Sequence, residues 1–173
     1  MTTTINADTV VGGAVVTADA SGQLGLQAAG VTALTLNSTN ATFNKSLLET
    51  ATITAAAPTA TQNYDAITQQ VQNFTTSTAN NWTLNIRGSA TVSLNTLMAV
   101  GQSLTLVVIV TNGATAYYAS ALTIDGTSVT PKYQGGTAWT SGNASSNDVY
   151  SYTVIKTAAT PTYVVLASQT KFA

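Results

Sequence analysis

An apolar run between Leu104 and Val110 is the feature that most constrains the fold. Its apolar members are Leu104, Leu106, Val107, Val108, Ile109 and Val110. The run is too apolar for a solvent-facing strand and far shorter than the roughly 20 residues of a membrane helix. Asn112-Gly113 follows, a pair that supplies the positive φ angles of tight hairpin turns. The sequence therefore predicts a central sandwich strand followed by a hairpin turn.

A second turn signal, Asp125-Gly126, follows a weakly alternating stretch from Tyr117 to Ile124. Two such turns around aromatic and β-branched runs predict an antiparallel meander or Greek key, with no helix needed in the connections. Further strands are expected at Leu47–Ala57 as an edge strand, and at Trp82–Arg87, Ala90–Val100, Val149–Thr157 and Tyr163–Ser168. Roughly eight or nine strands after Leu47 indicate an all-β, jelly-roll-like antiparallel β-sandwich.

The stretch from Asn63 to Thr76 is ambiguous. Tyr64, Ile67, Val71 and Phe74 fall at intervals of three and four, which a helix would align on one face. The preceding Pro58 and the Thr-rich neighbours favour a strand instead. We predict a strand here, with a helix as the alternative.

The organisation predicted is an N-terminal anchoring arm with its linker at 1–45 and a β-sandwich domain at 46–173. Short apolar groups in the arm are separated by glycines: Val10-Val11, Val15-Val16, Leu24 with Leu26, and Val31 with Leu34 and Leu36. Such an extended β arm either adds strands to a neighbouring subunit or particle, or folds as a small subdomain on its own chain. The polar stretch Ser38–Lys45 is interpreted as the linker.

Charge is scarce in this chain. Five basic and six acidic residues make up 6% of the sequence, with a net charge of -1. Mixed surface charge normally keeps a monomer dispersed, so we expect self-assembly, with contacts that are nearly insensitive to salt. Five scattered cations do not neutralise a run of phosphates, so a nucleic-acid partner is not expected.

The residues available for chemistry are also few. The chain contains neither Cys nor His, and its six acids are isolated in sequence. We therefore predict no enzyme, no catalytic residues, no metal site and no cofactor. Arg87, at the end of a predicted strand, is interpreted either as an exposed charge or as the partner of one of these acids.

The N-terminal sequence MTTTINADTV lacks the basic and apolar segments of a secretory signal, and no segment reaches the length of a membrane span. We expect synthesis in a cytoplasm and no membrane partner. A Gly-rich loop from Lys132 to Asp148 carries Tyr133 and Trp139, which are the candidate glycan contacts because aromatic faces stack on sugar rings. The alternative is that both rings fold back to cover the open end of the sandwich.

Several long blocks resemble a C-terminal module of tailed-phage virion proteins, especially from phages of aquatic bacteria. These blocks are ATITAAAPTATQNYDAITQQVQNFTT, NNWTLNIRG, VTNGATAYYASALTIDGTSVTPKYQGG, GNASSNDVYSYTVIKT and VLASQTKFA. The opening INADTVVGGAVVTADASGQLGLQAAG is similar to leaders of the same group. Members often carry a Gly-rich or collagen-like shaft, and here only the short linker around Asn37–Lys45 stands in that place.

The resemblance implies a virion structural role, usually as a trimer on the particle surface, and it supplies no catalytic residues. Because the chain is also short, poor in charge and begins with a strand-poor arm that needs a partner, we expect a homotrimeric capsid decoration, or cement, protein whose arm binds the major capsid protein or another virion protein. The alternative is a short tail fibre or tip that binds host-surface glycans. Both place the chain on the surface of the phage particle after synthesis in the host cytoplasm.

Overall fold

The computed structural model describes residues 23–173, and the chain divides into two compact units, with the boundary in the sequence between Leu48 and Glu49. We call the described part of the first unit (23–48) the arm and the second unit (49–173) the body, and each is described by itself. The predicted apolar pairs Val10-Val11 and Val15-Val16 lie outside the described residues. Both units are built mainly from β-strands, so the all-β prediction is confirmed.

The arm is a three-stranded antiparallel sheet, called the arm sheet, with strands in the order β1 (Leu24–Ala28), β2 (Val31–Leu36) and β3 (Ala41–Phe43). Ala29 and Gly30 both take positive φ angles, 50° and 75°, and form the two-residue turn between β1 and β2. Asn37 forms the next turn, because its side-chain oxygen accepts hydrogen bonds from the backbone of Thr39 and Asn40. β3 therefore occupies part of the predicted linker, and irregular chain follows at 44–50.

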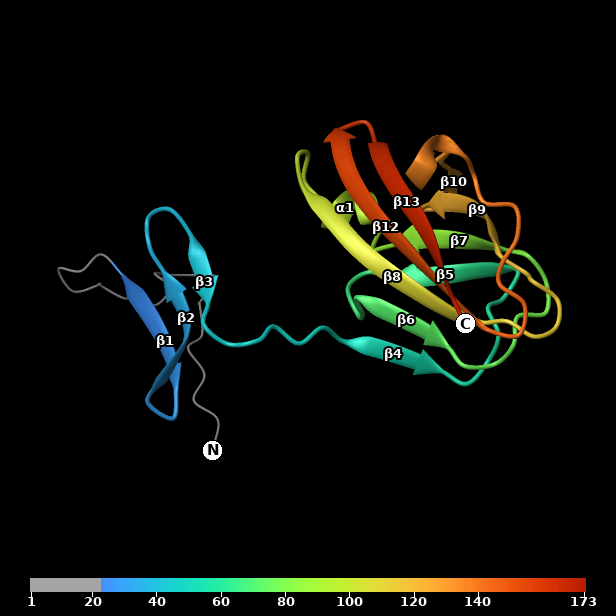
Figure 1. Cartoon of the computed structure of the whole chain (residues 1–173). Helices are drawn as coiled ribbons and strands as arrows, with labels where there is room; N and C mark the ends of the chain where they lie inside the picture. Colours follow the sequence, from blue (N-terminus) through green and yellow to red (C-terminus); the bar gives the residue numbers. More distant parts are fainter. Residues whose placement is uncertain (1–22) are drawn as a thin grey trace. The chain divides into compact units, whose positions relative to one another are not determined.

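The body consists of two sheets (Figure 1). The larger has six strands in the order β11-β13-β12-β8-β6-β4, and the smaller has four in the order β10-β9-β7-β5. In chain order the strands are β4 (Ala51–Thr54), β5 (Thr61–Asp65), β6 (Val71–Phe74), β7 (Trp82–Arg87), β8 (Ser103–Thr111), β9 (Ala119–Ile124), β10 (Thr127–Ser128), β11 (Lys132–Tyr133), β12 (Asn147–Ala158) and β13 (Thr162–Phe172). One helical turn, α1 (Leu94–Leu97), and one 3-10 turn, η1 (Gln134–Gly136), complete the body.

One hydrophobic core lies between the two sheets. The central strand β8 contributes Leu106, Val108 and Val110, which are at most 1% exposed. β12 pairs beside it and contributes Tyr150, Tyr152 and Val154, while the smaller sheet contributes Leu84, Ile86, Leu122 and Ile124. β8 lies between β6 and β12, so the prediction of a central strand at this apolar run is confirmed.

The pairing of the strands differs from the antiparallel arrangement that we expected. From β4 to β9 the chain crosses to the other sheet after every strand, and therefore returns to each sheet in the same direction. As a result β4, β6 and β8 are parallel neighbours in one sheet, and β5, β7 and β9 in the other. Antiparallel pairs in the body are confined to β8-β12, β12-β13 and β9-β10.

The two predicted turns had opposite outcomes. Asp125 and Gly126 have positive φ angles, 50° and 79°, and join β9 to β10 as a tight hairpin, so this prediction is confirmed. The hairpin predicted at Asn112-Gly113 is wrong, because neither residue has a positive φ and the chain crosses there from β8 to the other sheet. Asn112 is instead buried, with its side chain in a hydrogen-bond network described below.

Three further expectations can be compared with the fold. The stretch from Asn63 to Thr76 contains parts of β5 and β6 with a turn between them, so the strand prediction is confirmed over the helix. Leu47–Ala57 contains β4, which lies at the edge of the larger sheet as predicted. The strand predicted over Ala90–Val100 is wrong, because the Ser93 side chain caps the single turn of α1 there.

Candidate functional site

The four acidic residues of the body lie in different surroundings. Among residues 23–173, no three side chains of the types His, Cys, Asp and Glu gather at a point where a metal ion would be held. Asp65 forms an ion pair with Arg87, with 2.6 Å between Oδ1 and Nε, and this hydrogen bond raises the pKa of Arg87. Of the two interpretations of Arg87, the structure therefore supports the paired one.

Two charged side chains hold the ends of α1. The Asp125 carboxylate accepts hydrogen bonds from the backbone N–H groups of Leu94 and Asn95, at 2.7 and 3.1 Å. At the other end, Lys156 is buried and its Nζ donates to the carbonyls of Asn95 and Met98, both at 2.7 Å. Each charge is opposite in sign to the partial charge of the helix end that it contacts, and the contact is therefore favourable. Sequence reasoning assigned Asp125 only to a turn and did not identify Lys156.

The outward side of the smaller sheet carries a row of paired polar side chains. Asn85 donates to Asn63 Oδ1 at 2.8 Å and accepts from Thr123 Oγ1 at 2.8 Å. The parallel register places these three residues side by side. A hollow of about 400 Å³ lies next to them, lined by Asn85, Arg87, Asp125 and the 89–93 segment. The functional groups of its Asn85, Arg87 and Asp125 already contact other parts of the chain.

A buried polar network ties the β8-β9 crossing to β12. Asp148 is 0% exposed, and its Oδ2 accepts hydrogen bonds from Asn112 Nδ2 at 2.9 Å and from the Asn143 backbone N–H at 3.0 Å. Thr78 donates to Asn112 Oδ1. Burial, and after it the Asp148 carboxylate, raises the pKa of Tyr150. The network has a structural role, since it joins three loops at one end of the sandwich.

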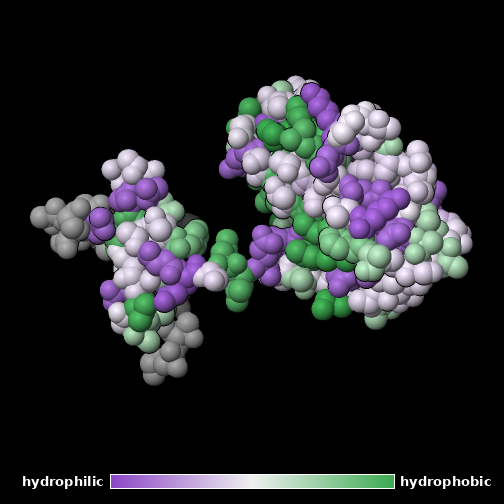
Figure 2. Space-filling view, in the orientation of Figure 1, coloured by the Kyte–Doolittle hydropathy of each residue, from purple (hydrophilic) through white to green (hydrophobic). Residues whose placement is uncertain are grey.

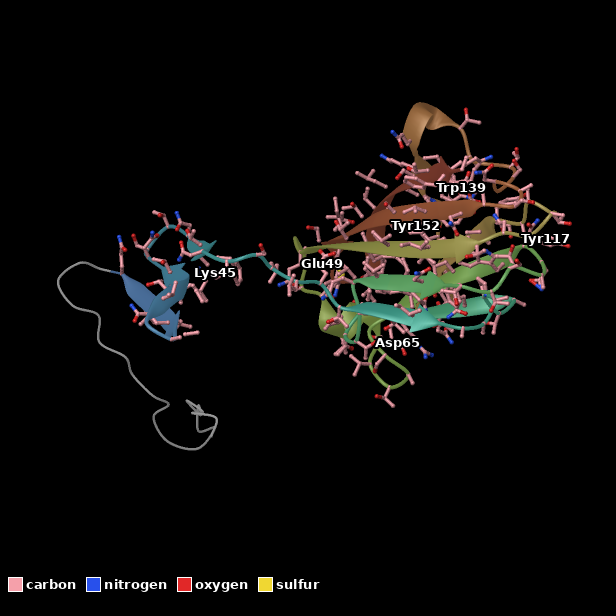
Figure 3. The ribbon with its side chains drawn as sticks, turned by 60° about the horizontal axis from the view of Figure 1, so that its bottom comes forward. Lys45, Glu49, Asp65, Tyr117, Trp139 and Tyr152 are labelled. Carbon is pink, nitrogen blue, oxygen red and sulfur yellow. The ribbon has the colours of Figure 1, made fainter. Side chains whose placement is uncertain are left out.

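Tyr133 and Trp139, the candidate glycan contacts, lie in contact with each other. Their ring centroids are 4.8 Å apart and their planes are nearly perpendicular. The Trp139 indole also packs on Tyr150 and on Tyr152, and Figure 3 labels Trp139 and Tyr152. Its Nε1–H donates to the Ala119 carbonyl at 2.6 Å. These contacts favour the interpretation that the loop aromatics cover the end of the core. Trp139 also lines a hollow of about 200 Å³ with Gln134, Ser168 and Gln169.

The arm sheet has a strongly apolar side, which we call the arm face. The register pairs Leu24 with Leu36 and Leu26 with Leu34, and Leu34 in turn with Phe43. Directly paired residues point to the same side of a sheet, so these large side chains lie together, and Val31 joins them through its pairing with Ala28. The arm face therefore consists of Leu24, Leu26, Val31, Leu34, Leu36 and Phe43.

None of the residues from Gln23 to Leu48 is buried. Phe43 is 58% exposed, Val31 50% and Leu26 43%. The described residues of the arm form a single sheet, whereas sheets usually gain their stability by burying the apolar side against a second layer. The arm face is therefore the best candidate functional site of the chain. The sequence signal for it was the alternation of Leu24 with Leu26 and of Leu34 with Leu36.

Comparisons with known protein families, curated proteins and solved structures found no significant match. No helix in the described part of the chain is long and apolar enough to cross a membrane. The fold and its surfaces thus define a mostly β chain with mixed sheets, made of a two-sheet body and an arm sheet whose apolar side carries no buried residue.

Proposed function

We propose that this chain is a structural protein of a tailed-phage virion, a homotrimeric capsid decoration protein that binds and stabilises the capsid surface. The observation that carries the proposal is the arm face, which presents six large apolar side chains, none of them buried. In this role the arm sheet packs its apolar side on the major capsid protein or on another virion protein.

The electrostatic character of the arm fits this role. No residue between Gln23 and Asn44 is charged, and Lys45 is the first charge that follows. Binding through such a surface depends on apolar burial, which salt does not weaken by screening. A particle exposed to waters of variable salinity gains from contacts of this kind. The resemblance of the body segments to virion proteins supports the same assignment.

The proposal is tested first by location. Capsids purified without tails should contain the chain, and its absence from them together with its presence in isolated tails would favour the alternative, a short tail fibre or tip that binds host glycans. The observation that favours this alternative is the contact between Tyr133 and Trp139 beside hollows of about 200 and 470 Å³.

The arm face is tested by substitution. Leu34→Asp places a carboxylate in the middle of the arm face, and we expect the fraction of the chain bound to capsids to fall at least about tenfold, because burying an unpaired charge is costly. The matched control is Thr42→Asp, since Thr42 pairs with Thr35 on the opposite side of the same sheet. Equal binding of both variants would contradict the proposal.

A further inference from the structure

The six-stranded sheet of the body has a second side that faces away from the core. On β8 this side carries Ser103, Thr105, Val107, Ile109 and Thr111, which alternate with the buried residues. On β12 it carries Asn147, Val149, Ser151, Thr153 and Ile155, and the register continues it over β13, β6 and β4. We call this surface the open face.

The open face is rich in aliphatic residues. Its large apolar members, which are half-buried or exposed, are Ile53, Val71, Val107, Ile109, Val149, Ile155, Val164, Leu166 and Phe172. Ile53 is 70% exposed, Phe172 51% and Leu166 47%. Figure 2 shows hydrophobic residues over the strands of this sheet, among residues of intermediate hydropathy and some hydrophilic ones. A hollow of about 530 Å³ lies at one end, lined by Asn73, Ile109, Val149 and Phe172, among others.

Charge is nearly missing from the open face. On the strands β4, β6, β8, β12 and β13 the charged side chains are Asp148, Lys156 and Lys171. Asp148 and Lys156 are buried on the core side. Lys171 pairs with Asp148 in the register and therefore belongs to the core side as well. Within the six described strands of this sheet, Lys132 on the edge strand β11 supplies the one charge of the open side. The other sheet differs, with its Asn63-Asn85 row and the Asp65-Arg87 ion pair.

We infer that the open face is the surface through which copies of this chain associate with one another. The open faces of copies that surround a symmetry axis meet without like-charge repulsion, and sheets with Val, Ile and Thr on the facing sides stack closely. A nucleic acid or a charged membrane surface would find no counter-charges on these five strands. The occupant that this surface fits is therefore a second copy.

The size of the open face suits a stable oligomer. Its three long strands have 9, 12 and 11 residues. With about 3.3 Å per residue and about 4.8 Å between strands, and with β4 and β6 added, the flat area is on the order of 600 Å². Accessible surface exceeds flat area, so the face approaches the roughly 800 Å² per partner of a specific interface. This inference adds a self-association surface to the proposed structural role and is independent of which virion component the arm binds.

The test is the molar mass of the purified full-length chain, measured by light scattering after size-exclusion chromatography. The wild type should have a multiple of 17.6 kDa. Thr105→Glu adds a carboxylate at an exposed site of the open face. A two-fold or three-fold interface repeats that charge in every copy, so the dissociation constant of the oligomer should rise about a hundredfold. The measured mass should then fall towards that of the monomer.

The matched control is Thr61→Glu, which makes the same change at an exposed Thr on β5 in the smaller sheet, and it should keep the mass of the wild type. Ser151→Glu is a second variant on the open face and should act like Thr105→Glu. Near-ultraviolet circular dichroism establishes that each variant is folded. A monomeric wild type, or an unchanged mass in both open-face variants, would overturn the inference. Leu34→Asp on the arm face should not change the mass, which separates this inference from the proposed function.

Discussion

Gly142 lies at the point where two side chains of the buried network and one backbone carbonyl converge. A Cβ added there would lie 2.6 Å from Asp148 Oδ2 and 2.7 Å from Asn112 Nδ2, and it would also overlap the Tyr117 carbonyl. The residue is glycine because the space is filled, since its φ angle is not positive. The close approach of the loop to Asp148 thus depends on a missing side chain.

We predict that Gly142→Ala lowers the free energy of unfolding by about 3 kcal/mol, because the methyl group forces apart hydrogen-bonded groups that cannot be repacked. Urea unfolding followed by tryptophan fluorescence measures this change. The control is Gly113→Ala, where the added Cβ meets only Ser77 at an ordinary 3.5 Å. A loss of stability equal to that of the control would show that the loop moves aside freely.

Single residues also show why one of the two turns predicted from the sequence formed and the other did not. Asp125-Gly126 behaves as its local preference predicts. Asn112-Gly113 has the same preference, yet Asn112 donates to Asp148 and accepts from Thr78, residues 36 and 34 positions away. A buried network of distant partners outweighs a turn preference, and short-range patterns do not reveal such partners.

At the scale of elements, α1 is a helix of only four residues and is held from outside. Isolated helices of this length do not form in water, because nucleation fixes several residues for few hydrogen bonds. Asp125 from the β9-β10 hairpin and Lys156 from β12 supply the missing partners at its two ends. The turn therefore exists because two strands present charges to it.

We predict that Asp125→Ala destabilises the body by about 2 kcal/mol, because two helix N–H groups lose their acceptor and Ala at φ 50° is strained. Thermal unfolding measured by calorimetry checks this value. Asp125→Asn keeps one acceptor oxygen and the tolerance of positive φ, so it should cost less than half as much. If the two substitutions cost the same, the carboxylate does not stabilise α1.

The elements that the sequence predicted well are those with strong periodicity, such as β7 and β8, and the edge strand β4. The prediction of a strand over Ala90–Val100 was wrong because α1 forms there. Asp125, which stabilises α1, is 31 positions from Leu94 and so lies outside the local pattern. The parallel order of β4, β6 and β8 was also missed, since alternation within a strand carries no information about its neighbours. For the candidate site, the alternating Leu residues of the arm could be seen in the sequence. That they lie on one side of a sheet follows only from the register of β1, β2 and β3.

At the scale of the whole molecule, buried tyrosines make the body sensitive to alkali. Burial raises the pKa of Tyr64, Tyr150 and Tyr152 above the ordinary value of about 10. Above about pH 10 the unfolded chain loses these protons while the folded chain keeps them. The unfolded state then binds fewer protons, so the free energy of unfolding falls as pH rises, and this contribution is fully present only below about pH 10.

The measurement is guanidinium unfolding at about pH 9, 10 and 11, together with phenolate absorbance. We expect the denaturation midpoint to fall over this range and most phenolate to appear only as the body unfolds. Tyr152→Phe removes one buried hydroxyl and should make the fall less steep. Full ionisation near pH 10 in an intact fold would contradict the burial of these rings.

From β4 to β9 the chain passes around the core and adds one strand to each sheet in turn, so that β4-β5, β6-β7 and β8-β9 are successive pairs. The connection from β7 to β8 also contains the residues of α1. We expect that the insertion or deletion of one such pair of strands would change the width of both sheets by one strand and would leave the closing β12-β13 pair intact. By this path the body would become broader or narrower in whole steps.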